Sequence, residues 1–210
     1  MGIAERKERE KQQRREDIVQ AAEKVFFSRG FDRSTMDDIA DEAELSKGTL
    51  YLYFNSKEDL HMEVAHRAVS MLKDSMNRLM DPGENALEKL VKMGRATVDF
   101  YREFPNHMRS IMFLEGIGLQ QISFSAEQVR EVIYKESPVG MVIGIIEQGV
   151  KEKLIRDDIP PAIIGHTLWM QMMSVMRFVT MKSAIFEMLD LTPADIYESH
   201  FKLVLSGIRT

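Results

Sequence analysis

Helical periodicity is the feature that most constrains the fold of this chain. Apolar residues recur at spacings of three and four along its whole length, and alternating apolar and polar runs bounded by turns are missing from the sequence. The first clear stretch places one apolar face inward with Ile18, Ala21, Ala22, Val25 and Phe26. The pattern predicts an all-α protein in which each helix buries one face.

Two very short helices are predicted directly after this first one. Thr35, with Asp38 three residues later, has the pattern of a capping box and opens a helix over Met36–Ala43. A tight turn at residues 44–45 follows, and Ser46 then caps the next helix. This is the spacing of a helix-turn-helix within a three-helix bundle.

The second short helix offers an outward face that a purely structural bundle does not need. Its exposed residues are Lys47, Gly48, Thr49, Tyr51 and Leu52. The major groove of DNA admits one such helix, with its N-terminal residues facing the base edges. The sequence therefore predicts binding to double-stranded DNA.

Over about its first third, the chain resembles the tetracycline-repressor-like (TetR) family of bacterial regulators. The matching residues are Phe26, Gly30, Phe31, Thr35, Ile39, Ala40, Ala43, the run from Ser46 to Tyr51, Tyr53, Phe54 and the run from Ser56 to Leu60. The resemblance implies a homodimer that binds a palindromic operator, usually as a repressor that a small molecule releases from DNA. The rest of the chain fits the family only in the number and length of its helices.

The resemblance also implies which residues contact DNA. The set comprises Thr35, Ser46, Lys47, Gly48, Thr49, Tyr51, Leu52, Tyr53 and Lys57. Thr35, at a helix N-terminus, and Lys57 are assigned to phosphates, and Tyr53 to the DNA backbone. The other polar residues of the set face bases or nearby phosphates.

Some positions of this set have simpler explanations or depart from the family pattern. Capping alone would account for Thr35 and Ser46, and Lys57 could be a solvated surface charge. Leu52 replaces a residue that is often polar, so it contacts either a thymine methyl group or nothing. Glu44 stands where glycine is common, and a positive φ there would cost about 1 kcal/mol.

The charge of the chain is unevenly distributed. The net charge is −5, yet residues 1–15 hold six basic and three acidic side chains, whereas residues 16–60 hold five basic and eleven acidic ones. DNA binding must therefore depend on a few well-placed cations. The basic N-terminal segment is either a solvated extension of the first helix or an arm that contacts phosphates or the minor groove.

Composition excludes several other classes of protein. The absence of cysteine rules out disulfides, thiolate catalysis and cysteine-based zinc sites, and suits the cytoplasm. There is neither a secretory signal nor an apolar run long enough for a membrane span. His61 and His66 are five residues apart and so lie on different helix faces. We therefore expect no metal, no cofactor and no enzymatic activity.

The chain is expected to divide into a helix-turn-helix domain over residues 1–60 and a larger helical domain over residues 61–210. The boundary lies within the fourth helix, which runs from Ser56 to about Met80. Later helices are predicted over residues 86–104, 106–116, 125–154, 161–181 and 193–208, with Pro138 kinking or splitting the third of these. The last two are expected to pair with their twins in a homodimer.

The larger domain is rich in methionine and is expected to bind a small apolar or aromatic effector. Methionine adapts to irregular spaces and to varied ligands. The candidate pocket residues are Met108, Met112, Phe113, Tyr134, His166, Trp169, Met172, Met173 and Met176. Ordinary core packing is the competing explanation for each methionine. A helical enzyme or small-molecule carrier using the same pocket is the alternative function.

Overall fold

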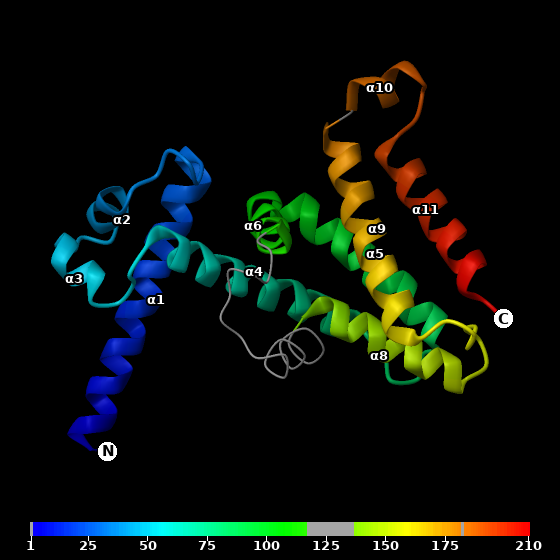
Figure 1. The fold of residues 1–210 in the computed structure, drawn as a ribbon, viewed down its shortest axis with the longest axis horizontal. Coiled ribbons are helices and arrows are strands. Elements are labelled where there is room, and N and C mark those ends of the chain that lie inside the picture. Colours follow the sequence, from blue (N-terminus) through cyan, green and yellow to red (C-terminus); the bar gives the residue numbers. More distant parts are fainter. Residues whose placement is uncertain (1, 117–136, 182) are drawn as a thin grey trace. The chain divides into compact units, whose positions relative to one another are not determined.

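The computed structural model describes residues 2–116, 137–181 and 183–210, and these are helical almost throughout. Figure 1 shows α1 (Ile3–Arg29), α2 (Met36–Glu42), α3 (Lys47–Tyr51), α4 (Lys57–Leu79), α5 (Ala86–Glu103), α6 (Pro105–Gly116), α8 (Pro138–Lys151), α9 (Pro161–Met181), α10 (Ser183–Met188) and α11 (Pro193–Ile208). Within the described ranges β pairing is limited to one isolated bridge, between Ile155 and Arg209. The predicted all-α class is confirmed.

The described residues form two compact units. The first comprises residues 2–70 and 104–116, and the second comprises residues 71–103, 137–181 and 183–210. Helix α4 therefore contributes its first half to one unit and its second half to the other. The boundary expected at residue 60 lies within α4, and α6 belongs to the first unit although it is far from α1–α3 in sequence.

The first unit is built around the apolar face of α1. Ile18, Ala22 and Phe26 are buried against residues of α2 and α3 such as Ile39 and Leu50. The periodicity of the sequence anticipated this core.

Helix α1 ends at Gly30. This residue has φ +82° and ψ 151°, a conformation that glycine adopts far more readily than other residues. Its N–H donates to the carbonyl oxygen of Phe26 at 2.9 Å. The reversal brings the ring of Phe31 to 5.5 Å from that of Phe26, between centroids. Gly30 thus sets the direction in which the chain leaves α1.

Side-chain caps define the starts of α2 and α3. The Asp38 N–H donates to Oγ1 of Thr35 at 3.2 Å, and the Thr35 N–H donates to Asp38 Oδ2 at 2.9 Å, which completes the predicted capping box. Oγ of Ser46 accepts from the Thr49 N–H at 3.1 Å. Capping is valuable here because helices of seven and five residues have few internal hydrogen bonds.

The turn between α2 and α3 contains a strained residue. Glu44 has φ +54°, which is the left-handed conformation that its departure from glycine had suggested. The Leu45 N–H then donates to the Ala40 carbonyl oxygen at 2.9 Å and closes the turn. The strain at Glu44 is thus part of the geometry that orients α3.

The second unit packs α8 against α9 and α5, and α11 against α9 and α5. Helix α8 begins at Pro138, and Ser137 is its N-cap, with Oγ accepting from the Gly140 N–H at 3.2 Å. Proline is favoured at this first position because it lacks an N–H that would have no helical partner there. Pro138 therefore starts a helix and does not kink one. Residues 125–136 of the longer predicted helix lie outside the described residues.

Candidate nucleic-acid interface and effector site

Helix α3 has one buried and one exposed side. Leu50 is fully buried in the first unit's core. On the other side, 44% of Tyr51 and 81% of Leu52 are exposed. Lys47 is also exposed, and its Nζ lies 2.7 Å from a carboxylate oxygen of Asp37. The exposed side thus combines an aromatic ring, an aliphatic chain and an ammonium group.

Gly48 lies on this exposed surface with space around it. A Cβ added there would have one neighbour within 4 Å, Oγ of Ser46 at 4.0 Å. Its φ is not in the positive region. The fold itself therefore does not require glycine at this position, whereas close approach of another molecule's backbone would.

The serine and threonine hydroxyl groups of the predicted set form hydrogen bonds within the protein. The Thr35 hydroxyl donates to Asp38 Oδ2 at 2.7 Å, and the Ser46 and Thr49 hydroxyls lie 2.8 Å apart. The hydrogen bonds from Thr35 are the main reason that the pKa of the Asp38 carboxyl lies below its usual value. These residues position the ends of α2 and α3 as caps.

Lys57 also has a structural environment. Its Nζ donates to the carbonyl oxygens of Phe31 at 3.0 Å and Ser34 at 3.2 Å, and it lies 4.4 Å from the centre of the Phe31 ring. The ammonium group thereby ties the start of α4 to the loop between α1 and α2. Tyr53, another member of the set, is half-buried against the core.

Arg15 has a role that the sequence did not reveal. The predicted basic arm forms the first part of α1, which begins at Ile3. Within it, Arg15 Nη2 lies 2.6 Å from a carboxylate oxygen of Glu63, and the guanidinium lies 4.3 Å from the centre of the Phe54 ring. The sequence alone carried no signal for this contact, since the residues are about 40 to 50 positions apart.

The first unit also contains the buried imidazole of His61. Only 6% of this residue is exposed, and its ring centroid lies 4.6 Å from that of Phe31 and 4.2 Å from that of Phe113 on α6. Burial lowers the pKa of His61, so the ring is neutral at pH 7. Phe113 was predicted to line an effector pocket, but it lies in the first unit.

A second link from α6 joins Glu23 on α1. Nε2 of His107 lies 3.1 Å from one oxygen of the Glu23 carboxylate, and Arg67 lies 3.6 Å from the other. Burial raises the pKa of Glu23. The hydrogen bond to His107 and the charges of His107 and Arg67 together lower this pKa by more than burial raises it, so the net shift is downward. Met108, fully buried, and Met112, half-buried, belong to the same helix.

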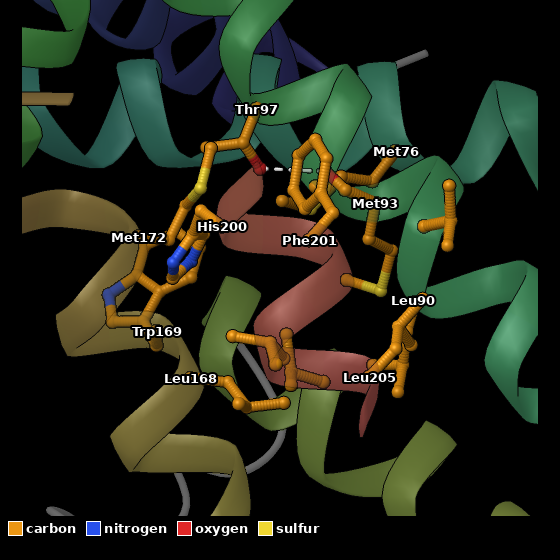
Figure 2. A pocket seen from close by; sticks show the side chains of 14 residues that line it. Met76, Leu90, Met93, Thr97, Leu168, Trp169, Met172, His200, Phe201 and Leu205 are labelled. Carbon is orange, nitrogen blue, oxygen red and sulfur yellow. Dashed lines mark hydrogen bonds between the residues drawn. The ribbon is translucent and has the colours of Figure 1, made fainter. Parts of the chain in front are cut away.

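The second unit contains a small apolar cavity of about 60 Å³. Its walls come from the second half of α4 and from α5, α8, α9 and α11. Figure 2 shows Trp169 and Met172, two of the predicted pocket residues, on one side of it beside His200 of α11, with Phe201 of α11 nearer to Met93. Thr97 is also in the wall, with its hydroxyl donating to the Met93 carbonyl oxygen at 2.8 Å.

The remaining predicted pocket residues lie elsewhere. Met173 and Met176 are buried on α9 but do not line this cavity. His166 is half-buried, with Nδ1 2.8 Å from the Ala162 carbonyl oxygen. Tyr134 lies outside the described residues. His200 and Phe201, which line the cavity, were not among the predicted pocket residues.

One signal could have indicated the neighbourhood of Phe201. Gly94 interrupts the middle of α5, where a glycine is unfavourable unless another group approaches closely. A Cβ at Gly94 would lie 2.9 Å or less from two ring carbons of Phe201. The glycine therefore makes room for this ring.

The outer faces of α9 and α11 are unusually apolar. Ile163 is 57% exposed and Leu203 75% exposed, and Met170 and Phe178 are also exposed. On α9 the exposed apolar residues follow helical spacing, so they form a stripe. Among the described helices, none is long and apolar enough to cross a membrane, and the described residues contain no group of metal-ligating side chains.

An exposed short helix, held by two side-chain caps and a tight turn in a three-helix head, defines the class of helix-turn-helix transcriptional regulators. The family model for bacterial regulatory proteins of the TetR family matches residues 18–64. The chain belongs to the TetR family of transcriptional regulators.

Individual relatives match over most of the chain. The HTH-type transcriptional repressor NicS of Pseudomonas putida is 30% identical over 149 residues, which cover 69% of this chain and 67% of NicS. The HTH-type transcriptional repressor KstR2 of Mycolicibacterium smegmatis is 27% identical over 150 residues, covering 70% and 69%. FadR of Thermus thermophilus, a TetR-family repressor solved with lauroyl-CoA, has the same fold, with a TM-score of 0.66, 20% identity and coverage of 92% and 94%.

Proposed function

We propose that this protein is a dimeric, ligand-responsive repressor that binds a palindromic DNA operator through α3 and has no catalytic role. The observation that carries the proposal is the exposed side of α3, where Tyr51 and Leu52 face solvent beside Gly48. Apolar and aromatic exposure of this kind, next to a glycine that the fold does not require, fits a surface that another molecule covers. In the major groove Leu52 would meet a thymine methyl group and Tyr51 the base edges.

The engaged polar groups fit the same function. Thr35, Ser46 and Lys57 hold α2, α3 and the loop before them in a fixed geometry. A recognition helix must be held in a fixed position in the groove, because its side chains reach the base edges only in a narrow range of positions. In this proposal Lys47 and Tyr51 contact DNA directly, Tyr53 contacts the backbone, and the hydroxyls and Lys57 place the phosphate-binding backbone of the head.

The apolar stripe on α9 supports dimerisation. Ile163 and Met170 on α9 and Leu203 on α11 would leave water if these faces paired with a second copy. A four-helix interface of this kind is common in helical dimers. Two heads related by a twofold axis could then occupy successive major grooves, about 34–36 Å apart.

Effector control rests on the cavity of the second unit. Trp169 and Met172 line a hollow whose walls are otherwise almost wholly apolar. The relative from Thermus thermophilus, solved with lauroyl-CoA, has a fold of the same kind. A ligand that binds one arrangement of the dimer better than another would shift operator affinity by that difference.

The direct test is selection of genomic fragments by the purified protein, followed by footprinting of the selected sequence. We expect a protected palindrome and binding that weakens steeply with salt. Tyr51→Ala should lower the affinity for the operator and also the preference for its sequence, because it removes a contact at the base edges. Tyr197→Phe, at a buried position on α11 of the second unit, is the control and should bind normally.

Three results would contradict the proposal. The first is selection of no common sequence, with binding equal on all fragments. The second is a monomer in sedimentation at micromolar concentration, which would remove the basis for a palindromic site. Wild-type binding by Tyr51→Ala would show that α3 is not the reading helix.

A further inference from the structure

The first three turns of α1 project from the first unit. Residues 4–14 are all exposed, whereas Ile18, farther along the helix, is fully buried. At about 1.5 Å per residue, residues 3–14 reach about 18 Å beyond Arg15. Figure 1 shows this α1 extension running past α3 toward the N-terminus. Most helices in proteins are stabilised by the packing of one face, so a projecting helix offers all its faces to another molecule.

Three cations of the α1 extension share one face of the helix. Lys7, Lys11 and Arg14 are four and three residues apart, and the buried Ile18 follows four residues later. Residues at these spacings lie above one another on a helix. None of the three cations forms a salt bridge with any residue that the structure describes. They form a basic stripe in line with the buried face of α1.

The acidic residues of the α1 extension lie away from the basic stripe or are bound by another cation. At about 100° of rotation per residue, Glu5 and Glu8 point about 90° or more from the centre of the stripe. Glu10, at its edge, has a carboxylate oxygen 2.8 Å from Nε of Arg6. Residues 3–14 hold five basic and three acidic side chains, and their positive potential is strongest along the stripe.

Arg15 fixes the point at which the α1 extension leaves the first unit. Its Nη1 donates to the Tyr53 carbonyl oxygen at 3.4 Å, and its guanidinium lies 4.3 Å from the centre of the Phe54 ring. These two residues come two and three positions after Tyr51, the last residue of α3. The extension therefore begins beside the end of the helix that is proposed to read DNA.

The basic stripe faces the side of the first unit on which α3 lies. It continues the face of α1 that carries Ile18, and Ile18 packs in the same core as Leu50 of α3. Leu50 is on the inner side of α3, whereas Tyr51 and Leu52 are exposed on its outer side. A duplex bound by that outer side lies in the direction in which the stripe faces. The stripe therefore points toward the backbone of the bound DNA.

The composition of the α1 extension suits phosphates and not lipid. Ile3 and Ala4 are its only apolar residues, whereas a helix that binds a membrane surface needs an apolar face. The stripe spans about 10 Å from Lys7 to Arg14. Double-stranded DNA carries one negative charge for about every 1.7 Å of its axis. Three cations in line can therefore meet several phosphates of a neighbouring duplex.

We propose that the α1 extension is a second DNA contact, in which Lys7, Lys11 and Arg14 bind phosphates that flank the half-site read by α3. Arg15 is a positioning residue, because it ties the base of the extension to the end of α3. The contact adds affinity and lengthens the protected sequence without reading bases. The proposal rests on the proposed function, since it extends the DNA-binding surface of the same unit.

The test compares two double variants of the full-length protein that remove the same charge from the same helix. Lys7→Gln with Lys11→Gln changes the stripe, and Arg6→Gln with Arg9→Gln, the control, changes other sides of the helix. Glutamine keeps the helix propensity in both. At about 0.1 M salt the stripe variant should bind the selected operator at least tenfold more weakly than wild type, and the control should stay within about twofold of it. The salt slope of the stripe variant should fall by about 3–4 for a dimer, since each lost phosphate contact contributes about 0.9.

The length of the operator duplex tests where the stripe binds. Wild type should bind a duplex with about ten flanking base pairs at each end at least fivefold more tightly than a duplex that ends at the half-sites. The stripe variant should lose this preference, and the control should keep it. Footprinting should show a shorter protected sequence for the stripe variant than for wild type.

Equal losses of affinity in the two double variants would overturn the proposal, because the effect would then come from charge in general. An unchanged preference of the stripe variant for the longer duplex would overturn it as well. Weaker binding of the stripe variant to structured RNA, with operator binding unchanged, would assign the stripe to RNA and overturn the DNA contact. A wild type that selects no operator contradicts the proposed function, and a random duplex then becomes the probe. The stripe variant must still bind that duplex more weakly than the control does.

Discussion

The two compact units of this protein use their polar and flexible side chains differently. In the first unit, the charged groups of Lys57 and Arg15 contact other parts of the protein, and the hydroxyls near α2 and α3 serve as caps. In the second unit, methionines surround an incompletely filled cavity, and apolar residues such as Leu203 face outward. A surface that reads DNA needs rigidity, whereas a surface that responds to ligands and partners needs space and uncovered apolar area.

Two isoleucines give the largest test of this difference. Ile39→Ala removes a fully buried side chain from the first unit's core and should lower the free energy of unfolding by about 2–5 kcal/mol. Ile163→Ala, at an exposed position on α9, should change the stability of each chain little and should weaken self-association instead. Denaturant unfolding and sedimentation, at one protein concentration, measure the two effects. Equal losses of stability would mean that the units are not packed differently.

Two lysines test whether charges in the head are structural. Lys57→Met removes the ammonium that binds the carbonyls of Phe31 and Ser34, and should lower unfolding free energy by about 1.5–3 kcal/mol. Lys47→Met, at an exposed position, should leave unfolding unchanged and weaken operator binding. Unfolding and the salt dependence of binding are compared. A Lys57→Met protein with normal stability and a salt slope reduced by about one would make Lys57 a phosphate contact after all.

Acid should lower the stability of the first unit through His61. Burial lowers the pKa of His61, so this residue binds a proton more readily in the unfolded chain than in the folded one. The contribution of the neutral ring to the folding free energy is therefore complete above about pH 6.5 and is lost as the pH falls. The slope is at most about 1.4 kcal/mol per pH unit for one proton. His61→Phe should reduce the difference in urea stability between pH 7.5 and 5.5, whereas His66→Gln at an exposed position should not. Since burial also lowers the pKa of His200, with the same sign, an unchanged pH dependence in His61→Phe would assign the effect to the second unit.

The smallest effect is expected at the turn before α3. Glu44→Gly relieves a positive φ that costs about 1 kcal/mol, but glycine also loses more entropy on folding, so the net gain should be below about 1 kcal/mol. Asp41→Gly, within helical α2, is the control and should destabilise by about 0.5–1 kcal/mol. Thermal unfolding distinguishes the two signs. A loss of stability in Glu44→Gly would show that the glutamate side chain contributes to the turn.

Local features of the fold were predictable, and long-range ones were not. The caps at Thr35 and Ser46 depend on neighbours within four residues, so their spacing in the sequence was sufficient. The positive φ of Glu44 was suggested only by the family pattern, in which glycine is common at this position. The carbonyls that bind Lys57 lie 23 and 26 positions earlier, at places that only the folded loop brings together. Pro138 was expected to kink or split a longer helix, and the N-cap at Ser137 shows that a helix starts there.

The candidate effector site was predictable only in part, for a similar reason. Clustering of methionines pointed to Trp169 and Met172, which share α9. His200 comes from α11 and carries no pattern that marks it as part of a pocket. Met108 and Phe113 are also in a methionine-rich stretch, but their helix packs in the first unit. Composition identifies adaptable side chains and does not say which side of a helix they occupy.

The discontinuity of the first unit has a consequence during protein synthesis. Its residues 2–70 leave the ribosome before α6, which contributes Phe113 and His107 to the same unit. At a synthesis rate of about 5–20 residues per second, residues 2–70 are complete a few seconds before this helix is made. Until then the rings of His61 and Phe31 lack a neighbour that covers them in the finished protein. The newly made head therefore cannot reach its final packing until about half of the chain has been translated, so a truncated product would carry an incomplete DNA-reading unit.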